Sequence, residues 1–224
     1  KDLEALQSGG VDAIMFGNEF DRPYVLKAPP EGLAALATII GQVKSMIKVP
    51  FGVNYLWDPI ATVALAVATE ANFAREIYTG LYASDMGLWA PDCAGAARLR
   101  SSNGRPDLQL LFTINAEFAT SLDKRPLDIQ AKSAVFSSKA DAICVSGLMT
   151  GMSVDQVELR KVRESIPETP LLANTGVTID NVEEIFSCTD GCVIGSHLKH
   201  HGDTWNSVDP DRVRKFIDKV DDIR

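Results

Sequence analysis

Short apolar runs rich in β-branched residues alternate along this chain with longer segments whose apolar residues recur at helical spacing. The runs predict seven strands, at residues 11–16, 49–55, 73–78, 108–114, 141–147, 170–176 and 191–196. The longer segments predict helices, most clearly at residues 30–47, 58–71, 153–166, 178–187 and 209–223. Asp58 and Asp209 each precede a proline at a predicted helix start, an arrangement typical of a capped N-terminus. A helical pattern follows each strand, so the chain repeats a strand–helix unit.

This repetition predicts an α/β fold around a parallel sheet. Nearly continuous apolar runs are typical of strands buried on both faces. Right-handed crossovers arrange such strands as an open doubly wound sheet or as a closed barrel, and a barrel needs eight strands and about 250 residues. Residues 1–10 have the pattern of a helix end with a glycine stop. We therefore expect residues 1–224 to form a single (β/α)8 TIM barrel domain whose first strand precedes Lys1.

Composition and charge narrow the function classes. A hydrophobic content of 46% in 224 residues is enough for one sizeable core. The formal net charge of −8 disfavours a nucleic-acid partner, and a small anionic ligand would need local basic or amide groups. No apolar run approaches the ~20 residues of a membrane span. The four cysteines are typical of free thiols in a cytoplasmic protein, and the chain is open to homo-oligomer formation.

The catalytic candidates follow from barrel geometry, because active sites of such barrels lie at the C-terminal ends of the strands. Arg75 and Glu76 are adjacent within a predicted strand, and an unpaired charge on either face of it is costly. They form either a structural ion pair or a polar layer of the ligand cavity, which we expect near Asp85. The proton-transfer candidates are Glu19, Asp85, Glu117, Arg75 and Glu76. Further polar substrate contacts are predicted for Asn18, Asn54, Ser146 and Asn174.

No metal or organic cofactor is specified by a motif. Neither G-x-G-x-x-G nor G-x-x-x-x-G-K-[ST] follows the early strands. Mg2+ is conceivable on the carboxylates of Glu19, Asp21, Glu76, Asp85 and Glu117, but no spacing demands it. Zinc needs three or four convergent ligands, and the three histidines, His197, His200 and His201, crowd one short stretch. We therefore predict neither a zinc site nor a catalytic role there.

The last two predicted strands carry the clearest binding signal. The stretches "NTGVTIDN" and "GSHLK" each leave a strand through a glycine, where a backbone can approach an anion closely. Neighbouring loops of this kind form the phosphate grip of many barrels, and a helix start near residue 178 would add N-terminal amides. The alternative is a pair of ordinary turns. The predicted phosphate-binding residues are Thr175, Gly176, Val177, Gly195, Ser196 and Lys199.

Several stretches together resemble the BtpA family. They are "QSGGVDAIMFGNEFDRPY", "FGVNYLWDP", "REIYTGLYASDMGLW", "DAICVSGLMTG", "LLANTGVTIDNVEE" and "VDPDRVRKFIDKV". Within that family the chain is most similar to SgcQ-like members from bacterial sugar operons. The resemblance implies a TIM barrel of the ribulose-phosphate-binding type, but it implies no settled reaction. One branch of the family is associated with photosystem I biogenesis, and the operon branch is presumed to act on sugars.

Two functions remain open from the sequence. The favoured one is an enzyme of sugar metabolism acting on a phosphorylated sugar or a similar small anion, as an isomerase, epimerase, aldolase or hydrolase. Only Lys199 lies where an imine-forming lysine is needed, which argues against imine chemistry. The alternative is a non-catalytic assembly or regulatory factor. A polar cavity with a perturbed carboxylate favours the enzyme, and an exposed apolar patch over the barrel mouth favours the factor.

Overall fold

Seven parallel strands form the main sheet of the protein, which a computed structural model describes over residues 1–224. In sheet order they are β1 (Ile14–Gly17), β2 (Phe51–Asn54), β3 (Phe73–Glu76), β6 (Gln109–Thr113), β8 (Ala142–Val145), β9 (Leu171–Ala173) and β10 (Gly191–Cys192). All seven predicted strands exist. Each is shorter than its apolar run.

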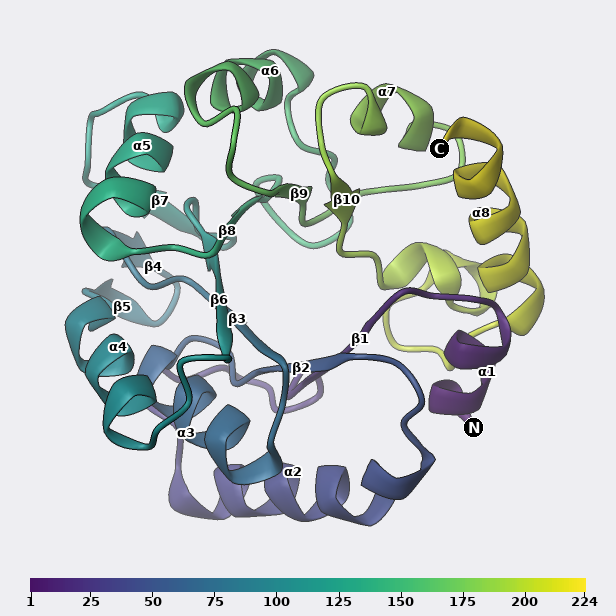
Figure 1. The fold of residues 1–224 in the computed structure, drawn as a ribbon, viewed down its shortest axis with the longest axis horizontal. Helices are drawn as coiled ribbons and strands as arrows, with labels where there is room; N and C mark the ends of the chain where they lie inside the picture. The colour runs from purple at the N-terminus through teal and green to yellow at the C-terminus, as the bar shows by residue number, and fades with distance from the viewer.

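A ring of helices covers the outer side of the sheet (Figure 1). The α-helices are α1 (Asp2–Ser8), α2 (Pro30–Val43), α3 (Pro59–Thr69), α4 (Cys93–Ser102), α5 (Leu127–Ser138), α6 (Gln156–Ser165), α7 (Val182–Phe186) and α8 (Pro210–Ile223). Short 3-10 turns lie at η1 (Lys44–Met46), η2 (Ser196–Leu198) and η3 (His200–Gly202). As predicted, one helix follows each strand of the sheet. No helix combines the length and the apolar character that crossing a membrane requires.

The sheet curls around a central space, so the predicted barrel architecture is confirmed as a half-barrel of seven strands (Figure 1). β1 and β10 are its two edges and do not pair with each other. The eighth strand expected before Lys1 remains a prediction.

Alternation along the strands separates the core from the barrel interior. Val53 pairs with Ala74, and Phe112 pairs with Ile143. All four are buried in the main hydrophobic cluster that joins sheet and helices. Neighbouring positions must face the other way. The residues next to these four along the strands, which include Arg75, therefore face the barrel interior.

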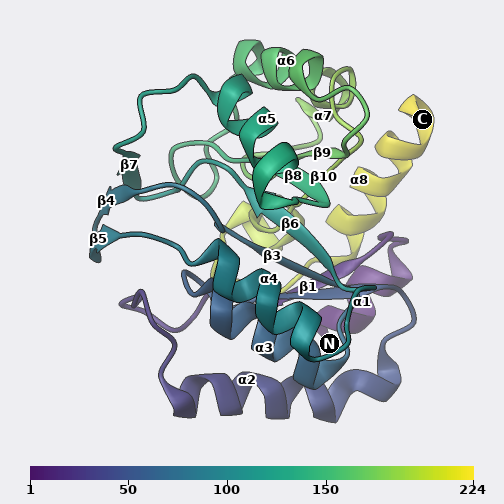
Figure 2. The same ribbon diagram turned by 60° about the vertical axis from the view of Figure 1, so that its left-hand side comes forward.

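A small antiparallel sheet that the sequence did not predict projects from one side of the barrel (Figure 2). Its strands are β4 (Tyr82–Ser84), β5 (Gly87–Trp89) and β7 (Ala119–Ser121), in the order β5-β4-β7. Three-residue strands that mix serine, glycine and apolar residues leave no periodic signal. The sheet buries Tyr82 and Trp89 in a second hydrophobic cluster with Trp57.

The cap of α3 gives a first testable expectation. Asp58 Oδ1 accepts a hydrogen bond from the Ala61 N–H, and its Oδ2 accepts one from the Ala28 N–H, both over 3.0 Å. Asp58→Ala should therefore lower the free energy of unfolding by about 1–3 kcal/mol in urea titrations. Asp92 caps α4 through a single bond to the Gly95 N–H, so Asp92→Ala should cost less. Equal losses would show that the second bond of Asp58 contributes nothing.

Candidate functional site

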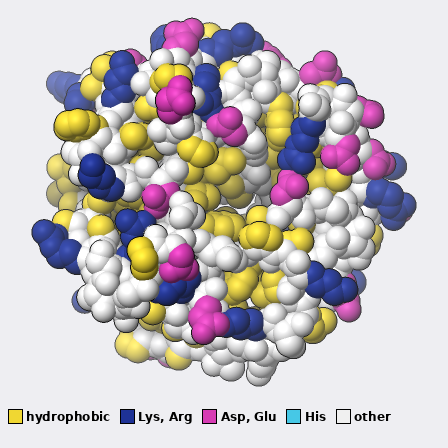
Figure 3. Space-filling model, viewed as in Figure 1, with side chains coloured by type: hydrophobic (Ala, Val, Ile, Leu, Met, Phe, Trp, Pro, Cys, Tyr) yellow, Lys and Arg dark blue, Asp and Glu magenta, His cyan; other side chains and the backbone are white.

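A cavity of about 520 Å³ lies within the curl of the sheet. Its walls come from β1 and β3 and from the loops that follow β6, β8, β9 and β10, with α1 at one side. Figure 3 shows a hollow near the middle of this face, with hydrophobic side chains around it. The cavity therefore lies where the strands end, the position expected for the site of a barrel.

All six residues predicted to bind phosphate line this cavity. The backbone N–H groups of Gly176, Val177, Gly195 and Ser196 donate no hydrogen bond within the protein. Gly176 has a φ of +64°, which only glycine adopts without strain. Two neighbouring loops of the cavity wall thus contain four amides without an internal acceptor, a feature suited to binding an anion.

The helix expected to assist this grip begins later than predicted. The pattern over residues 178–187 forms only α7, Val182–Phe186. The Thr178 N–H is already bonded to the Asn181 side-chain oxygen over 2.8 Å. That bond holds the chain in a turn before the helix starts. The N-terminal amides of α7 therefore make no contribution next to Gly176.

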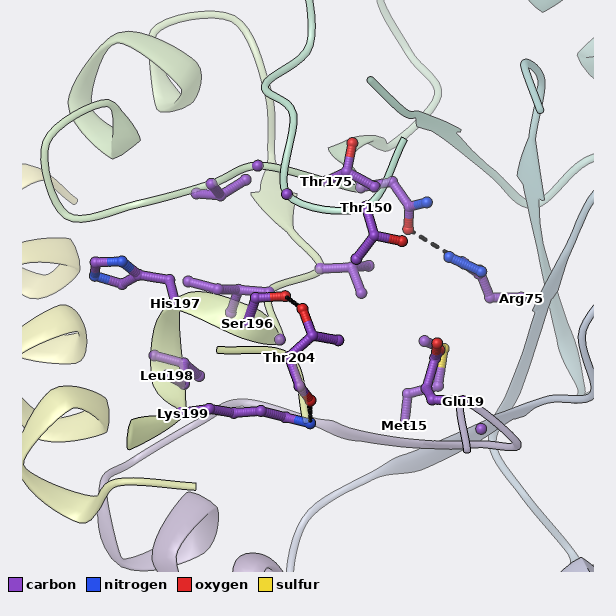
Figure 4. Close-up of a pocket in the computed structure, with 18 of the residues that line it drawn as sticks. Met15, Glu19, Arg75, Thr150, Thr175, Ser196, His197, Leu198, Lys199 and Thr204 are labelled. Carbon is purple, nitrogen blue, oxygen red and sulfur yellow. Dashed lines mark hydrogen bonds between the residues drawn. The ribbon is translucent and has the colours of Figure 1, made fainter. Parts of the chain in front are cut away.

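The side chains of the predicted grip have different roles. Thr175 Oγ1 accepts from the Gly147 N–H and donates to the Met152 carbonyl, so it ties the loop after β9 to the loop after β8. Ser196 Oγ lies 2.6 Å from Thr204 Oγ1, and Lys199 Nζ donates to the Thr204 carbonyl (Figure 4). Lys199 is the only lysine that lines the cavity. Lys199 therefore supplies positive charge to the part of the cavity formed by the loops after β9 and β10.

The histidines do not converge. The His197 ring lies against α8 and away from the cavity centre (Figure 4), with Nδ1 3.2 Å from Arg212 Nη2. Burial and the nearby Arg212 guanidinium lower the pKa of His197, which favours its neutral form. His200 Nδ1 lies 3.2 Å from Asp209 Oδ2, and His201 is exposed. No three His, Cys, Asp or Glu side chains in the chain are grouped as metal ligands would be.

A buried hydrogen-bond network crosses the barrel interior at the strand ends. Arg75 Nε donates to Asn174 Oδ1 over 3.0 Å, and Arg75 Nη1 donates to Asn54 Oδ1 over 2.8 Å. Asn174 Nδ2 donates to Ser146 Oγ over 2.6 Å, while Asn54 Nδ2 donates to Glu76 Oε2 over 3.1 Å. All five residues are buried. Arg75 and Glu76 thus form a polar layer of the cavity joined through Asn54, and they are not a direct ion pair.

Two carboxyl groups of the cavity have perturbed acidity. Burial raises the pKa of Glu76 to about 8, although Arg75 and two hydrogen bonds to its Oε2 oppose the shift. Burial also raises the pKa of Glu117, whose Oε2 accepts from the Thr150 hydroxyl over 2.9 Å. Glu19, in the loop after β1, also lines the cavity. A carboxyl group whose pKa lies near neutral pH, as that of Glu76 does, is suited to proton transfer.

Several predicted site residues lie elsewhere. Asp85 is exposed in the turn between β4 and β5 and does not line the cavity, because the unpredicted hairpin carries it outward. The expectation that Asp85 accompanies Arg75 and Glu76 was therefore wrong. Asn18 accepts from the Leu56 N–H, and Asp21 accepts from the Tyr55 hydroxyl, so both hold loops together. Asn54 and Ser146 orient the lining residues without lining the cavity themselves.

The sequence reasoning missed Thr113, Trp57 and Phe20, which line the cavity. Thr113 was detectable, because it lies on β6 two residues after Leu111, the partner of Arg75, and therefore shares its face. Phe20 packs edge-on against Trp205 with ring centroids 5.5 Å apart, and Arg22 lies 3.4 Å above the Trp205 ring. This contact joins the loop after β1 to the loop after β10, and no pattern in the local sequence predicts it.

Comparison of the sequence with known proteins confirms its resemblance to the BtpA family. The model of the BtpA family matches residues 1–222. The Escherichia coli K12 protein described as putative sgc region protein SgcQ is 50% identical over 223 residues, which cover 100% of this chain and 83% of that protein. The photosystem I biogenesis protein BtpA of Synechocystis is 28% identical over 223 residues, covering 98% of this chain and 77% of that protein.

Solved structures confirm the fold. Phosphoribosyl anthranilate isomerase from Thermus thermophilus superposes with a TM-score of 0.61 at 14% identity, covering 98% of this chain and 92% of that one. An archaeal fructose-1,6-bisphosphate aldolase gives a TM-score of 0.61 at 15% identity, covering 97% of this chain and 82% of that one. These identities are low, so the two likenesses bear on the fold alone. They support the TIM barrel type and leave the reaction open.

Proposed function

Because this chain belongs to the BtpA family, we propose that it is an enzyme that binds a phosphorylated sugar in its cavity and moves a proton on it. The unbonded amides of Gly176, Val177, Gly195 and Ser196 carry the proposal. Amides that face a cavity without an internal acceptor are suited to an oxyanion.

The charge distribution fits a phosphate at this end. The whole chain has a formal net charge of −8, so its general field repels anions. Lys199 lines the same cavity as the four amides, and its ammonium donates to the Thr204 carbonyl. Local donors thus oppose the general field at the point where the phosphate would lie.

The remaining groups suit an isomerase or an epimerase. Burial raises the pKa of Glu76 to about 8, so this carboxyl group can give or take a proton near neutral pH, and burial shifts the pKa of Glu117 in the same direction. Arg75 lies between these carboxyl groups and Asn174 and can stabilise an oxyanion that forms during proton removal. An imine mechanism is not favoured, because the ammonium of Lys199 donates to a backbone carbonyl at the phosphate end.

A second candidate is a non-catalytic assembly factor, and the Synechocystis relative is described as a photosystem I biogenesis protein. One observation favours it. The loop after β8 exposes Leu148, Met149 and Met152, whose relative exposures are 75%, 47% and 46%. Thr150 and Gly151 of the same loop line the cavity, so the apolar patch lies beside the opening. Binding of small phosphates supports the enzyme, and its absence supports the factor.

Removal of the Lys199 charge tests the phosphate grip. Lys199→Met should weaken binding of fructose 6-phosphate about 10-fold in calorimetric titrations, because one charge-assisted contact is lost. Lys161→Met is the matched control, since Lys161 pairs with Glu158 on the exposed surface of α6 and should leave binding unchanged. Equal affinities for both variants would place the phosphate elsewhere.

A further inference from the structure

Arg75 is a buried cation without a counterion. Its relative exposure is 8%, and its two intramolecular acceptors are the neutral amide oxygens of Asn174 and Asn54. It takes part in none of the ion pairs of the protein. A buried charge is costly unless an opposite charge compensates it. The missing charge must therefore come from another source.

The nearest carboxyl groups, those of Glu76 and Glu117, form no ion pair with Arg75. Glu76 is hydrogen-bonded to Asn54 and to the Ile77 N–H, and burial raises its pKa to about 8, so it is largely protonated at neutral pH. Glu117 is bonded to Thr150, and burial raises its pKa also. The other titratable groups near Arg75 are the buried Cys144 and Tyr78, whose pKa values burial raises.

Polar atoms without a hydrogen-bond partner lie on Arg75 and on two residues near it. Arg75 Nη2 makes no hydrogen bond and is not among the fully enclosed unpaired atoms, so it is accessible from the cavity that Arg75 lines. Thr113 Oγ1 is enclosed and has no partner, and register places it on the same face as Arg75. Glu76 Oε1 is likewise enclosed and unpaired. Each of these residues lines the cavity.

We infer that Arg75 and Thr113 form a second anion subsite, and that the ligand is a phosphorylated sugar acid whose carboxylate lies there. Figure 4 shows Arg75 across the cavity from Ser196 and Lys199, so the two subsites would hold opposite ends of one molecule. A carboxylate matches the planar edge of a guanidinium and also accepts from a hydroxyl. This inference rests on the proposed phosphate grip, and it narrows the substrate from sugar phosphates to those that carry a terminal carboxylate.

Two matched ligands test it. The acid 6-phosphogluconate and the polyol glucitol 6-phosphate have the same chain length and phosphate, and they differ in a carboxylate against a hydroxymethyl group. In calorimetric titrations at neutral pH, the wild-type protein should bind 6-phosphogluconate about 10- to 100-fold more tightly, the range expected from one charge-assisted pair. Equal affinities would overturn the inference while leaving the phosphate grip intact. Failure of both ligands and of inorganic phosphate to bind would overturn the proposed function itself.

Two variants assign the preference to its residue. Arg75→Met should abolish the preference and leave the affinity for glucitol 6-phosphate within about 3-fold, because the phosphate end is untouched. Lys199→Met should weaken both ligands alike and keep the preference. A preference that survives in Arg75→Met would overturn the inference. Should that variant not fold, Arg75→Lys retains a charge without the planar fork and should lose part of the preference; an unchanged preference would again overturn it.

Discussion

Gly176→Ala should lower the free energy of unfolding by about 2–5 kcal/mol, a large effect for the addition of one methyl group. A Cβ at this position would lie 2.2 Å from the Met152 carbonyl carbon and from the Ser153 nitrogen. Both are backbone atoms, so no side chain can rotate away to relieve the contact. The φ of +64° adds the strain of a left-handed conformation. Urea unfolding monitored by tryptophan fluorescence measures the loss.

Gly195→Ala is the matched control in the facing loop. A Cβ there would meet no atom within 4 Å, and its φ of −132° is open to any residue. Its stability should stay within about 1 kcal/mol of the wild type. If Gly176→Ala were equally stable, the packing of the loop after β9 against the loop after β8 would be wrong, and the geometry of the grip would be wrong with it.

Glu76 should make the protein less stable as the pH rises from about 5 to 8. Burial raises its pKa to about 8 in the folded state, against 4.5 for an unperturbed glutamate. The folded protein therefore keeps a proton that the unfolded chain has released. Stability from this group is complete below the unfolded pKa, and it is lost as the pH rises toward the folded pKa. The slope attributable to Glu76 should approach about 1.4 kcal/mol per pH unit.

Glu76→Gln isolates this contribution, because the amide side chain has the same shape and no charge. Its oxygen can accept from Asn54 and from the Ile77 N–H as Glu76 Oε2 does. Urea titrations of both proteins at several pH values give the free energy of unfolding as a function of pH. This curve should be flatter for the variant, and the variant should be more stable than the wild type at pH 8. Glu158→Gln, on the exposed surface of α6, should leave the profile unchanged. Parallel profiles for wild type and Glu76→Gln would mean that Glu76 is ionised in the folded protein.

Much of this site was predictable because strand order and loop position fix where side chains converge. The glycine-containing exits of β9 and β10 predicted a phosphate-binding end, and its six predicted residues line one cavity, while phosphate binding there stays a prediction. A charged pair inside an apolar strand predicted the polar layer around Arg75 and Glu76. The phosphate end follows from the common edge at which parallel strands end, and the polar layer follows from the cost of an unpaired charge in an apolar strand.

The errors arise where tertiary contacts decide the outcome. Asp85 follows β3 in sequence, but a three-stranded sheet with no periodic signal carries it away from the cavity. The helix expected from residue 178 starts at Val182, because Asn181 holds the Thr178 N–H in a turn. The ion pair considered for Arg75 and Glu76 is replaced by a bridge through Asn54, whose side-chain amide bonds both residues from a neighbouring strand. None of these partners is visible from local pattern.

A crystal structure of the protein grown with a phosphorylated sugar tests the central claim most directly. We predict a phosphate between residues 175–177 and 195–196, with its oxygens accepting from the amides of Gly176 and Gly195 and with Lys199 turned toward it. The same crystals should show the other end of the ligand pointing to Arg75. An empty cavity at a saturating ligand concentration, or a phosphate bound outside these two loops, would contradict the account.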